Sequence, residues 1–332
     1  MERRALLQLA ALGISAGALG LSGEPVRQLL ALALDSEPRD IDDWHLTVSD
    51  HLHALRTQSP AQVRDGLVID LIAIQRQLRT DTGSEIELQR VTSGLSFLYA
   101  NVLTRLGDHG AAIHWSRTAR AAADASGDLD LRLMVRCEEA GYGLYGQRDL
   151  QTVLQLIEAA ERIAGDAPSF WLADLAGTRA KALARLGRRD EARQALNTLV
   201  GYEGEDFRAN FIPALRTGSQ APFAESWVYA YAGDEARTGR ARESVLSRTR
   251  DYQYAANVRL HEALCTVVNG GTDTGAKQAA EILATLPAGQ QSQMITDTGK
   301  AILRTVPLEQ RDRPSVRDLR ALVTGPSRHK LA

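Results

Sequence analysis

The sequence predicts an all-α protein, a helical-hairpin solenoid in which helix pairs stack side by side. Strand signals are scarce, because no Asn-Gly turn lies between alternating β-branched runs. Apolar residues recur instead at helical spacing along most of the chain. Breaks rich in glycine divide the chain into segments of roughly 15 to 22 residues, each long enough for one helix. Isolated helix pairs cannot bury their apolar faces, so stacked neighbours are expected to supply the core.

Composition narrows the class of protein. The 332 residues carry 39 Lys and Arg against 41 Asp and Glu, and 44% of them are hydrophobic. These values are typical of a globular protein and exclude both wholesale disorder and a strongly basic nucleic-acid binder. The two cysteines, Cys137 and Cys265, are too few for a disulfide framework or a structural zinc site. We interpret both as buried small hydrophobes in a cytoplasmic protein.

The chain divides into an apolar N-terminal helix or linker (1–36), a repeat domain (37–323) and a flexible tail (324–332). The first part contains Arg3-Arg4 and an apolar run, Ala5–Leu21, which are similar to a twin-arginine export signal. The alternative is a hydrophobic helix that packs on the body or, over Leu6–Leu34, on a second chain to give a homodimer. The run is short and only moderately apolar, so membrane association is not expected.

Helices are expected in order from residue 42. The first, Asp42–Arg56, repeats Trp44, Val48, Leu52 and Leu55 at helical spacing. Ser59-Pro60 predicts the start of the second, because serine is a favoured N-cap and proline suits the first helical position. The later helices lie between breaks at Thr82-Gly83, Gly107-Asp108, Gly127-Asp128, Gly146, Gly165-Asp166, Gly187, Gly233-Asp234, Gly270-Gly271 and Leu286-Pro287.

A repeat with a period of 40 residues runs through the middle of the chain. It aligns Gly107, Gln147 and Gly187 as turn residues between two helices. A small residue precedes each turn at the same spacing: Ala100, Ala140 and Ala180. Further units are expected around Tyr229–Asp234 and Ala263–Ala276.

This pattern resembles the tetratricopeptide repeat (TPR). In that family a small residue lets the two helices of a unit approach closely, and a glycine makes the turn between them. The resemblance implies a right-handed superhelix with a concave groove. The period is longer than the usual value of about 34, so longer helices or loops are expected. The middle unit matches least, because Gln147 stands at its turn position.

A narrower resemblance covers almost the whole chain. The sequence is similar to the long TPR-like C-terminal region of actinobacterial Xre-class helix-turn-helix transcriptional regulators. The segments that carry the resemblance are Arg3–Leu7, Glu225–Asp234, Leu260–Cys265, Val306-Pro307 and Arg313–Arg320, in that order. The DNA-binding domain of that family would precede Met1 and is not in this sequence. The resemblance therefore implies a regulatory or sensing module, without direct nucleic-acid binding by this chain.

No sequence motif predicts an enzyme. No Gly-x-Gly-x-x-Gly or Walker loop is present, and the seven histidines form no His-Glu-x-x-His pair. Asp50, His51 and His53 do not all share a helix face, so we interpret them as a solvated surface. The acid pairs Asp42-Asp43 and Glu138-Glu139 are interpreted as caps or helix surface. We expect no catalytic residue, no metal site and no cofactor.

The concave groove is the expected binding surface. In TPR arrays, fixed positions on the first helix of each unit line the groove, and Ala100 and Ala180 set the register here. Asparagine can bond a peptide N–H and C=O, Arg or Lys can hold a carboxylate, and aromatic rings can take apolar side chains. The residues so selected are Phe97, Asn101, Thr104, Arg105, Cys137, Tyr145, Asp174, Lys181, Arg185, Phe223, Trp227 and Tyr231.

Three functions follow as hypotheses. The first is a cytoplasmic regulatory TPR protein that binds a peptide or protein in its groove, in transcriptional or signalling control. The second is an exported TPR scaffold, which cleavage near Gly23 would reveal. The third is an enzyme or accessory protein with a helical pocket for a small molecule, which would need an ionisable cluster that spacing does not reveal. The repeats and the absence of catalytic motifs favour the first.

Overall fold

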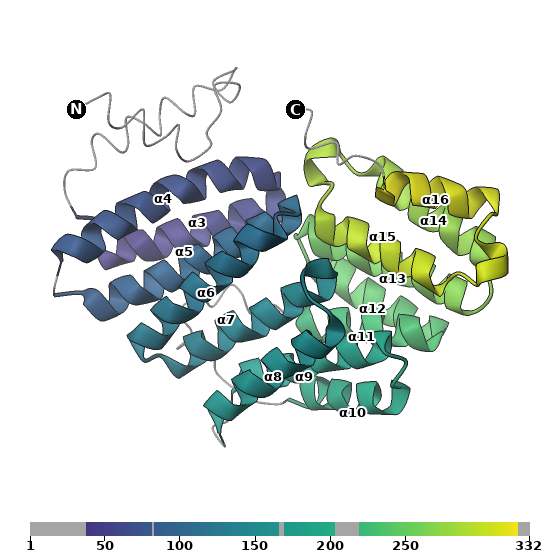
Figure 1. Cartoon of the computed structure of the whole chain (residues 1–332), viewed down its shortest axis with the longest axis horizontal. Coiled ribbons are helices and arrows are strands. Elements are labelled where there is room, and N and C mark those ends of the chain that lie inside the picture. The colour runs from purple at the N-terminus through teal and green to yellow at the C-terminus, as the bar shows by residue number, and fades with distance from the viewer. Residues whose placement is uncertain (1–37, 82, 166–168, 203–218, 325–332) are drawn as a thin grey trace.

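The protein is seen in a computed structural model that describes residues 38–81, 83–165, 169–202 and 219–324 (Figure 1). Within these ranges every regular element is a helix, which confirms the predicted all-α class. The predicted N-terminal segment (1–36) lies outside the described residues, and so does the predicted tail after Thr324. No helix of the described part is long and apolar enough to cross a bilayer.

Fourteen α-helices and three short helical turns follow one another along these ranges. They are α3 (Ile41–Thr57), α4 (Pro60–Thr80), α5 (Glu85–Leu106), α6 (His109–Ser126), α7 (Leu129–Tyr142), the π turn η2 (Gly143–Gln147), α8 (Leu150–Ala164), α9 (Phe170–Arg185), α10 (Arg189–Val200), α11 (Gln220–Ala232), α12 (Glu235–Arg248), α13 (Tyr252–Val268), α14 (Thr272–Thr285), η4 (Ala288–Gln290), α15 (Gln293–Thr305), η5 (Leu308–Gln310) and α16 (Pro314–Thr324).

Side-chain caps explain where many helices begin. Asp40 accepts a hydrogen bond from the Asp43 amide at the start of α3. Ser59 and Gln62 form a reciprocal capping box at the start of α4, with Pro60 in the first turn as predicted. Each cap satisfies a backbone N–H that the helix itself leaves without a partner.

Consecutive helices pack together: α5 on α6, α7 on α8, α9 on α10, α11 on α12 and α13 on α14. Gly107 and Gly187 occupy the predicted turns with φ of 81° and 76°, a left-handed conformation that favours glycine. The small residues Ala100, Ala140 and Ala180 are completely or almost completely buried, as close helix packing requires.

The middle unit departs from the predicted alignment. Its left-handed turn residue is Gly146, with φ of 85°, and Gln147 follows it. The π turn η2 ends α7 at this point. Gln147 reaches back to donate to the Thr104 hydroxyl in the neighbouring unit. The repeat therefore continues through this unit, but its turn comes one residue earlier than expected.

The array curves until its two ends meet. Helices α3–α6 lie on one side and α13–α16 on the other, with α7–α10 between them (Figure 1). Helix α15 packs against α5 and η2, and α13 contacts α3. One hydrophobic core cluster extends from Trp44 of α3 to Met294 of α15, so both ends share it. A second core cluster contains residues of α13, α14, α15 and α16 together with Ala230 of α11.

Candidate functional site

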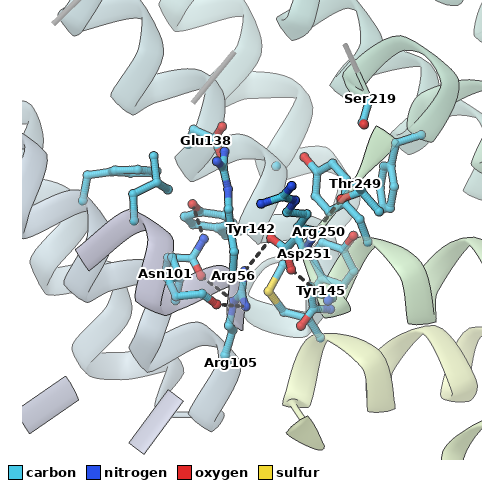
Figure 2. Close-up of a pocket in the computed structure, with 18 of the residues that line it drawn as sticks. Arg56, Asn101, Arg105, Glu138, Tyr142, Tyr145, Ser219, Thr249, Arg250 and Asp251 are labelled. Atoms are coloured by element: carbon cyan, nitrogen blue, oxygen red, sulfur yellow. Dashed lines mark hydrogen bonds and ion pairs between the residues drawn. The ribbon is translucent and has the colours of Figure 1, made fainter. Parts of the chain in front are cut away.

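A cavity of about 300 Å³ lies where the two ends of the array meet (Figure 2). Its lining comes from α3, α5, α7, η2, α9, α11, α13 and α15, from the residue before α11, and from the end of α12 with the linker to α13. The helices that contribute to the lining therefore surround a compact chamber at this point. The residues of the predicted groove that line it are Phe97, Asn101, Arg105, Tyr145, Lys181 and Phe223.

Arg105 is the centre of a hydrogen-bonded network at one wall. Its guanidinium donates to Asn101 Oδ1 at 2.8 Å, to the Leu55 carbonyl at 2.7 Å and to Asp251 Oδ2 at 3.2 Å. Asn101 donates in turn to the Tyr142 hydroxyl at 2.6 Å. Figure 2 shows these side chains converging from different helices. Arg105 is buried and well partnered, so its first role is to hold α3, α5 and the start of α13 together.

Glu138 faces the cavity, which corrects its interpretation as a cap or plain helix surface. It lies on α7 among the lining residues, above Arg105 in the view of Figure 2. Burial raises the pKa of Glu138 to about 7, and the nearby Asp174 carboxylate adds to the rise. A hydrogen bond with Tyr142 and the charge of Lys181 oppose it. This carboxyl is therefore divided between its two protonation states near neutral pH.

Two further groups that were expected on the surface are removed from water and make close polar contacts with other side chains. Glu139 is 2% exposed and pairs with Arg148 at 2.8 Å and Arg120 at 3.2 Å. His51 is half-buried, with Nε2 2.6 Å from Asp70 Oδ2. Both corrections have one cause: a carboxylate removed from water needs a charged or hydrogen-bonding partner.

Aromatic rings form much of the remaining wall. Phe97 stacks on Tyr142, with ring centroids 6.0 Å apart and planes 15° from parallel. Phe223 stacks on Tyr254 at 4.4 Å and 27°. The Lys181 ammonium lies 5.9 Å from the centroid of the Phe223 ring. The cavity thus offers flat apolar surfaces beside charged groups, a combination suited to an apolar group with a polar end.

Some predicted groove residues are used inside the protein and do not line the cavity. Thr104 is fully buried, donates to the Ala100 carbonyl and accepts from Gln147. Arg185 donates to the Leu144 carbonyl of η2. The π turn of the middle unit therefore occupies both side chains, which the regular repeat could not predict.

The last predicted residues also pack inside or beside the array. Cys137 is buried, as its interpretation as a small hydrophobe required, and its thiol donates to Asp174 Oδ2 at 3.1 Å. Trp227 packs edge-on against Tyr145, with centroids 5.7 Å apart. Tyr231 lies next to Trp227, at 6.4 Å. None of these four predicted residues, Cys137, Asp174, Trp227 and Tyr231, is part of the lining.

Sequence reasoning missed much of the lining. Glu138, Gly141 and Tyr142 belong to α7, whose register was set by a weak unit. The linker before α13 had no signal, because it reaches the cavity only through closure of the array. The missed residues are Leu52, Leu55, Arg56, Glu138, Gly141, Tyr142, Ser219, Arg248, Thr249, Arg250, Asp251, Gln253, Tyr254 and Met294.

One buried pair has the residue types of a nucleophile and a base. Ser226 Oγ lies 2.8 Å from His261 Nδ1, but Ser226 also donates to the Phe223 carbonyl. The serine hydroxyl is thus shared between a backbone carbonyl and the imidazole ring. Both residues are at most 1% exposed, and burial lowers the pKa of His261 to about 3. This arrangement supports helix packing and gives no activated nucleophile.

Within the described ranges, no group of three or more His, Cys, Asp or Glu side chains is placed to hold a metal ion. Comparison of the chain with protein-family models, with curated proteins and with solved structures finds no match. Function is therefore inferred from the cavity and its lining.

Proposed function

We propose that this chain is a regulatory helical-repeat protein of the TPR type, related to the repeat region of Xre-class transcriptional regulators. It senses a peptide or protein partner, which inserts an anchoring group into the central cavity from the concave side. The observation that carries this proposal is the cavity of about 300 Å³, lined by six of the residues that the repeat register selected. A space of this size accepts a side chain or a chain end, while the rest of a partner stays outside.

The position of the cavity supports a sensing role. Arg105 of α5 and Asp251 before α13 meet at its wall, although they are far apart in sequence. A group that enters beside this contact interacts with both ends of the array at once. Binding would then favour one relative position of the two ends, and a downstream partner could recognise that position.

Binding rather than catalysis is favoured by the chemistry of the lining. Burial raises the pKa of Glu138 to about 7, and the described lining residues include one serine, Ser219, and no cysteine. A cytoplasmic location and a homodimer through Leu6–Leu34 belong to the same proposal. The nearly balanced charge, -2 overall, favours partners other than nucleic acid. The alternative remains an exported scaffold, for which cleavage near Gly23 is the distinguishing observation.

A native mass spectrum of the protein purified gently from its own host tests the proposal. We expect the intact chain with an added peptide-sized or protein-sized mass. Gly141 lies on α7 in the cavity lining, and a Cβ there would meet only the Thr178 hydroxyl, at 3.9 Å. Gly141→Leu should therefore fill the cavity without breaking the helix and should remove the added mass.

Gly239 provides the matched control. It also lies inside a helix, α12, and does not line the cavity. A Cβ added at Gly239 would have no neighbour within 4 Å among the described residues. Gly239→Leu should retain the added mass. Retention of the mass by Gly141→Leu, or its absence from the wild-type protein, would remove the proposed function.

A further inference from the structure

Gln253 carries an unused hydrogen-bond donor at the cavity. This residue lies in the first turn of α13, lines the cavity and is 2% exposed. Its Nε2 atom is buried without a hydrogen-bond partner in the described part of the protein. A buried amide N–H without a partner costs about 1–3 kcal/mol. This donor is closed to solvent in the structure, so a ligand oxygen reaches it only when the side chains around it move apart.

The orientation of this amide is fixed by its neighbour. Ser292 Oγ accepts the Ile295 amide at 3.3 Å as the N-cap of α15. The single hydroxyl proton of Ser292 is donated to Gln253 Oε1. Turning the amide over would make Nε2 donate to the serine oxygen and would leave the hydroxyl proton of Ser292 without its described acceptor. Nε2 is consequently the end of the amide without a hydrogen-bond partner, and it requires an acceptor.

The charges of the lining favour a negative ligand. Among the described residues, five cationic side chains line the cavity against two carboxylates, Glu138 and Asp251, and Arg56 and Arg248 have other partners. Asp251 is already paired with Arg105. Arg250 is exposed and makes no ion pair with any described residue, and it stands three positions before Gln253. The cations are Arg56, Arg105, Lys181, Arg248 and Arg250.

The aromatic side chains of the lining favour a ligand that carries a flat ring. The stacked pairs Phe97–Tyr142 and Phe223–Tyr254 both contribute to the wall. Aromatic faces prefer offset or edge contacts with another ring, and each such contact contributes about 0.5–1.5 kcal/mol beyond its buried area. A cavity of about 300 Å³ holds one ring system with a short acidic substituent.

From these observations we propose that the cavity is a site for a small aromatic carboxylate, with one carboxylate oxygen received by Gln253 Nε2 and the charge by the Arg250 guanidinium. The ring lies among the aromatic side chains of the wall. This ligand chemistry can come from a free aromatic acid or from the aromatic C-terminal residue of a peptide. The inference rests on the proposed function, because it specifies the anchoring group that the cavity accepts.

Calorimetric titration of the full chain with indole-3-acetate and with the uncharged indole-3-acetamide tests the charge requirement. The acid should bind about tenfold more tightly than the amide, since a charge-assisted hydrogen bond contributes about 1.5–3 kcal/mol. The tripeptide Ala-Ala-Phe, with a free or an amidated C-terminus, distinguishes the two sources. If the natural ligand is the C-terminal residue of a peptide, the tripeptide with a free C-terminus should bind more tightly than indole-3-acetate.

Two variants locate the binding groups. Arg250→Ala should reduce the affinity for the acid about tenfold and leave that for the amide unchanged, whereas Gln253→Met should weaken both, because the carbonyl oxygen of the amide also accepts from Nε2. Arg317→Ala on α16, an exposed arginine outside the lining, is the control and should bind like the wild type. Circular dichroism shows whether each variant keeps its helices, and Arg250→Ala gives the decisive comparison if Gln253→Met loses them.

Equal affinities for acid and amide, or no binding of either at millimolar concentration, would overturn the inference. So would an Arg250→Ala variant with wild-type affinity for the acid. These results are distinguishable from failure of the proposed function. If Gly141→Leu removes a host-derived mass that Arg250→Ala retains in full, the cavity binds a partner, but not through an anion.

Discussion

Arg105 and Arg185 lie 80 residues apart, which is two repeat periods of about 40, so they occupy the same position in two repeat units. Their surroundings nevertheless differ. Arg105 is buried and contacts Asn101, the Leu55 carbonyl and Asp251. Arg185 is only half-buried and donates to a single backbone carbonyl, and burial lowers the pKa of its guanidinium. Equivalent positions in a repeat can therefore have different roles when only one of them lies at the closure of the array.

The difference comes from long-range contacts. Arg105 meets Asp251 because α13 has come round to α3, and these helices are distant in the chain. Arg185 meets η2, the irregular turn of the unit before it. The repeat register fixes which way both side chains point, but the curvature of the whole array decides which partners they find.

Of the substitutions at these two positions, Arg105→Met is expected to cause the larger loss of unfolding free energy. Loss of Arg105 leaves Asp251 without its cation at a buried site, which costs about 3–5 kcal/mol. Arg185→Met should cost about 1 kcal/mol, because it removes one hydrogen bond to a carbonyl. Urea unfolding of both variants measures the difference, and similar losses would contradict the contrast between the two units.

The turn glycines of two repeat units can be compared in the same way. Gly146 and Gly187 both have positive φ, 85° and 76°. A Cβ on Gly146 would lie 2.9 Å from Asp297 Oδ2 of α15, whereas no described atom lies within 4 Å of one on Gly187. Gly187→Ala should cost about 1 kcal/mol from backbone strain alone. Gly146→Ala should cost about 2 kcal/mol, because the α15 contact must also shift. Thermal unfolding gives the ranking, and a smaller loss at Gly146 would be inconsistent with close packing of α15.

Many of the features compared here could be predicted from the sequence, and those that could not have physical causes. Helix positions and the turns at Gly107 and Gly187 follow from local periodicity and from glycine chemistry. The turn at Gly146 was assigned one residue too late, because the fixed period of 40 was set by the neighbouring units and this unit ends in an irregular π turn. Arg250 and Gln253 were missed because they lie at the start of a helix pair, and only closure brings them to the cavity.

Leu98, Glu138 and Thr178 also share one repeat position, and only Glu138 titrates. Its pKa is about 7 in the folded protein against an ordinary 4.5, so the folded state binds more protons between these values. Stability should therefore fall as the pH rises from about 4.5 to about 7, and the loss should persist above that range. Glu138→Gln removes the penalty and should be more stable than the wild type at pH 8, by on the order of 2 kcal/mol.

Glu139 gives an internal control for this titration. Glu139→Gln leaves Arg120 and Arg148 without their shared carboxylate and should be less stable than the wild type at neutral pH. Denaturant unfolding of both variants at pH 5 and pH 8 distinguishes the two neighbours. If Glu138→Gln showed the same stability difference from the wild type at both pH values, Glu138 would not be the group that titrates.

Closure of the array around the cavity is the central claim, and a double-mutant cycle on Arg105 and Asp251 tests it most directly. Asp251→Asn keeps an N-cap side chain for α13 while it removes the charge. Unfolding free energies of the wild type, Arg105→Met, Asp251→Asn and the double variant should give a coupling of about 2 kcal/mol. The exposed pair Arg313–Asp273 should give less than about 1 kcal/mol in the same measurement. A coupling for Arg105 and Asp251 as small as that of the surface pair would contradict a closed array.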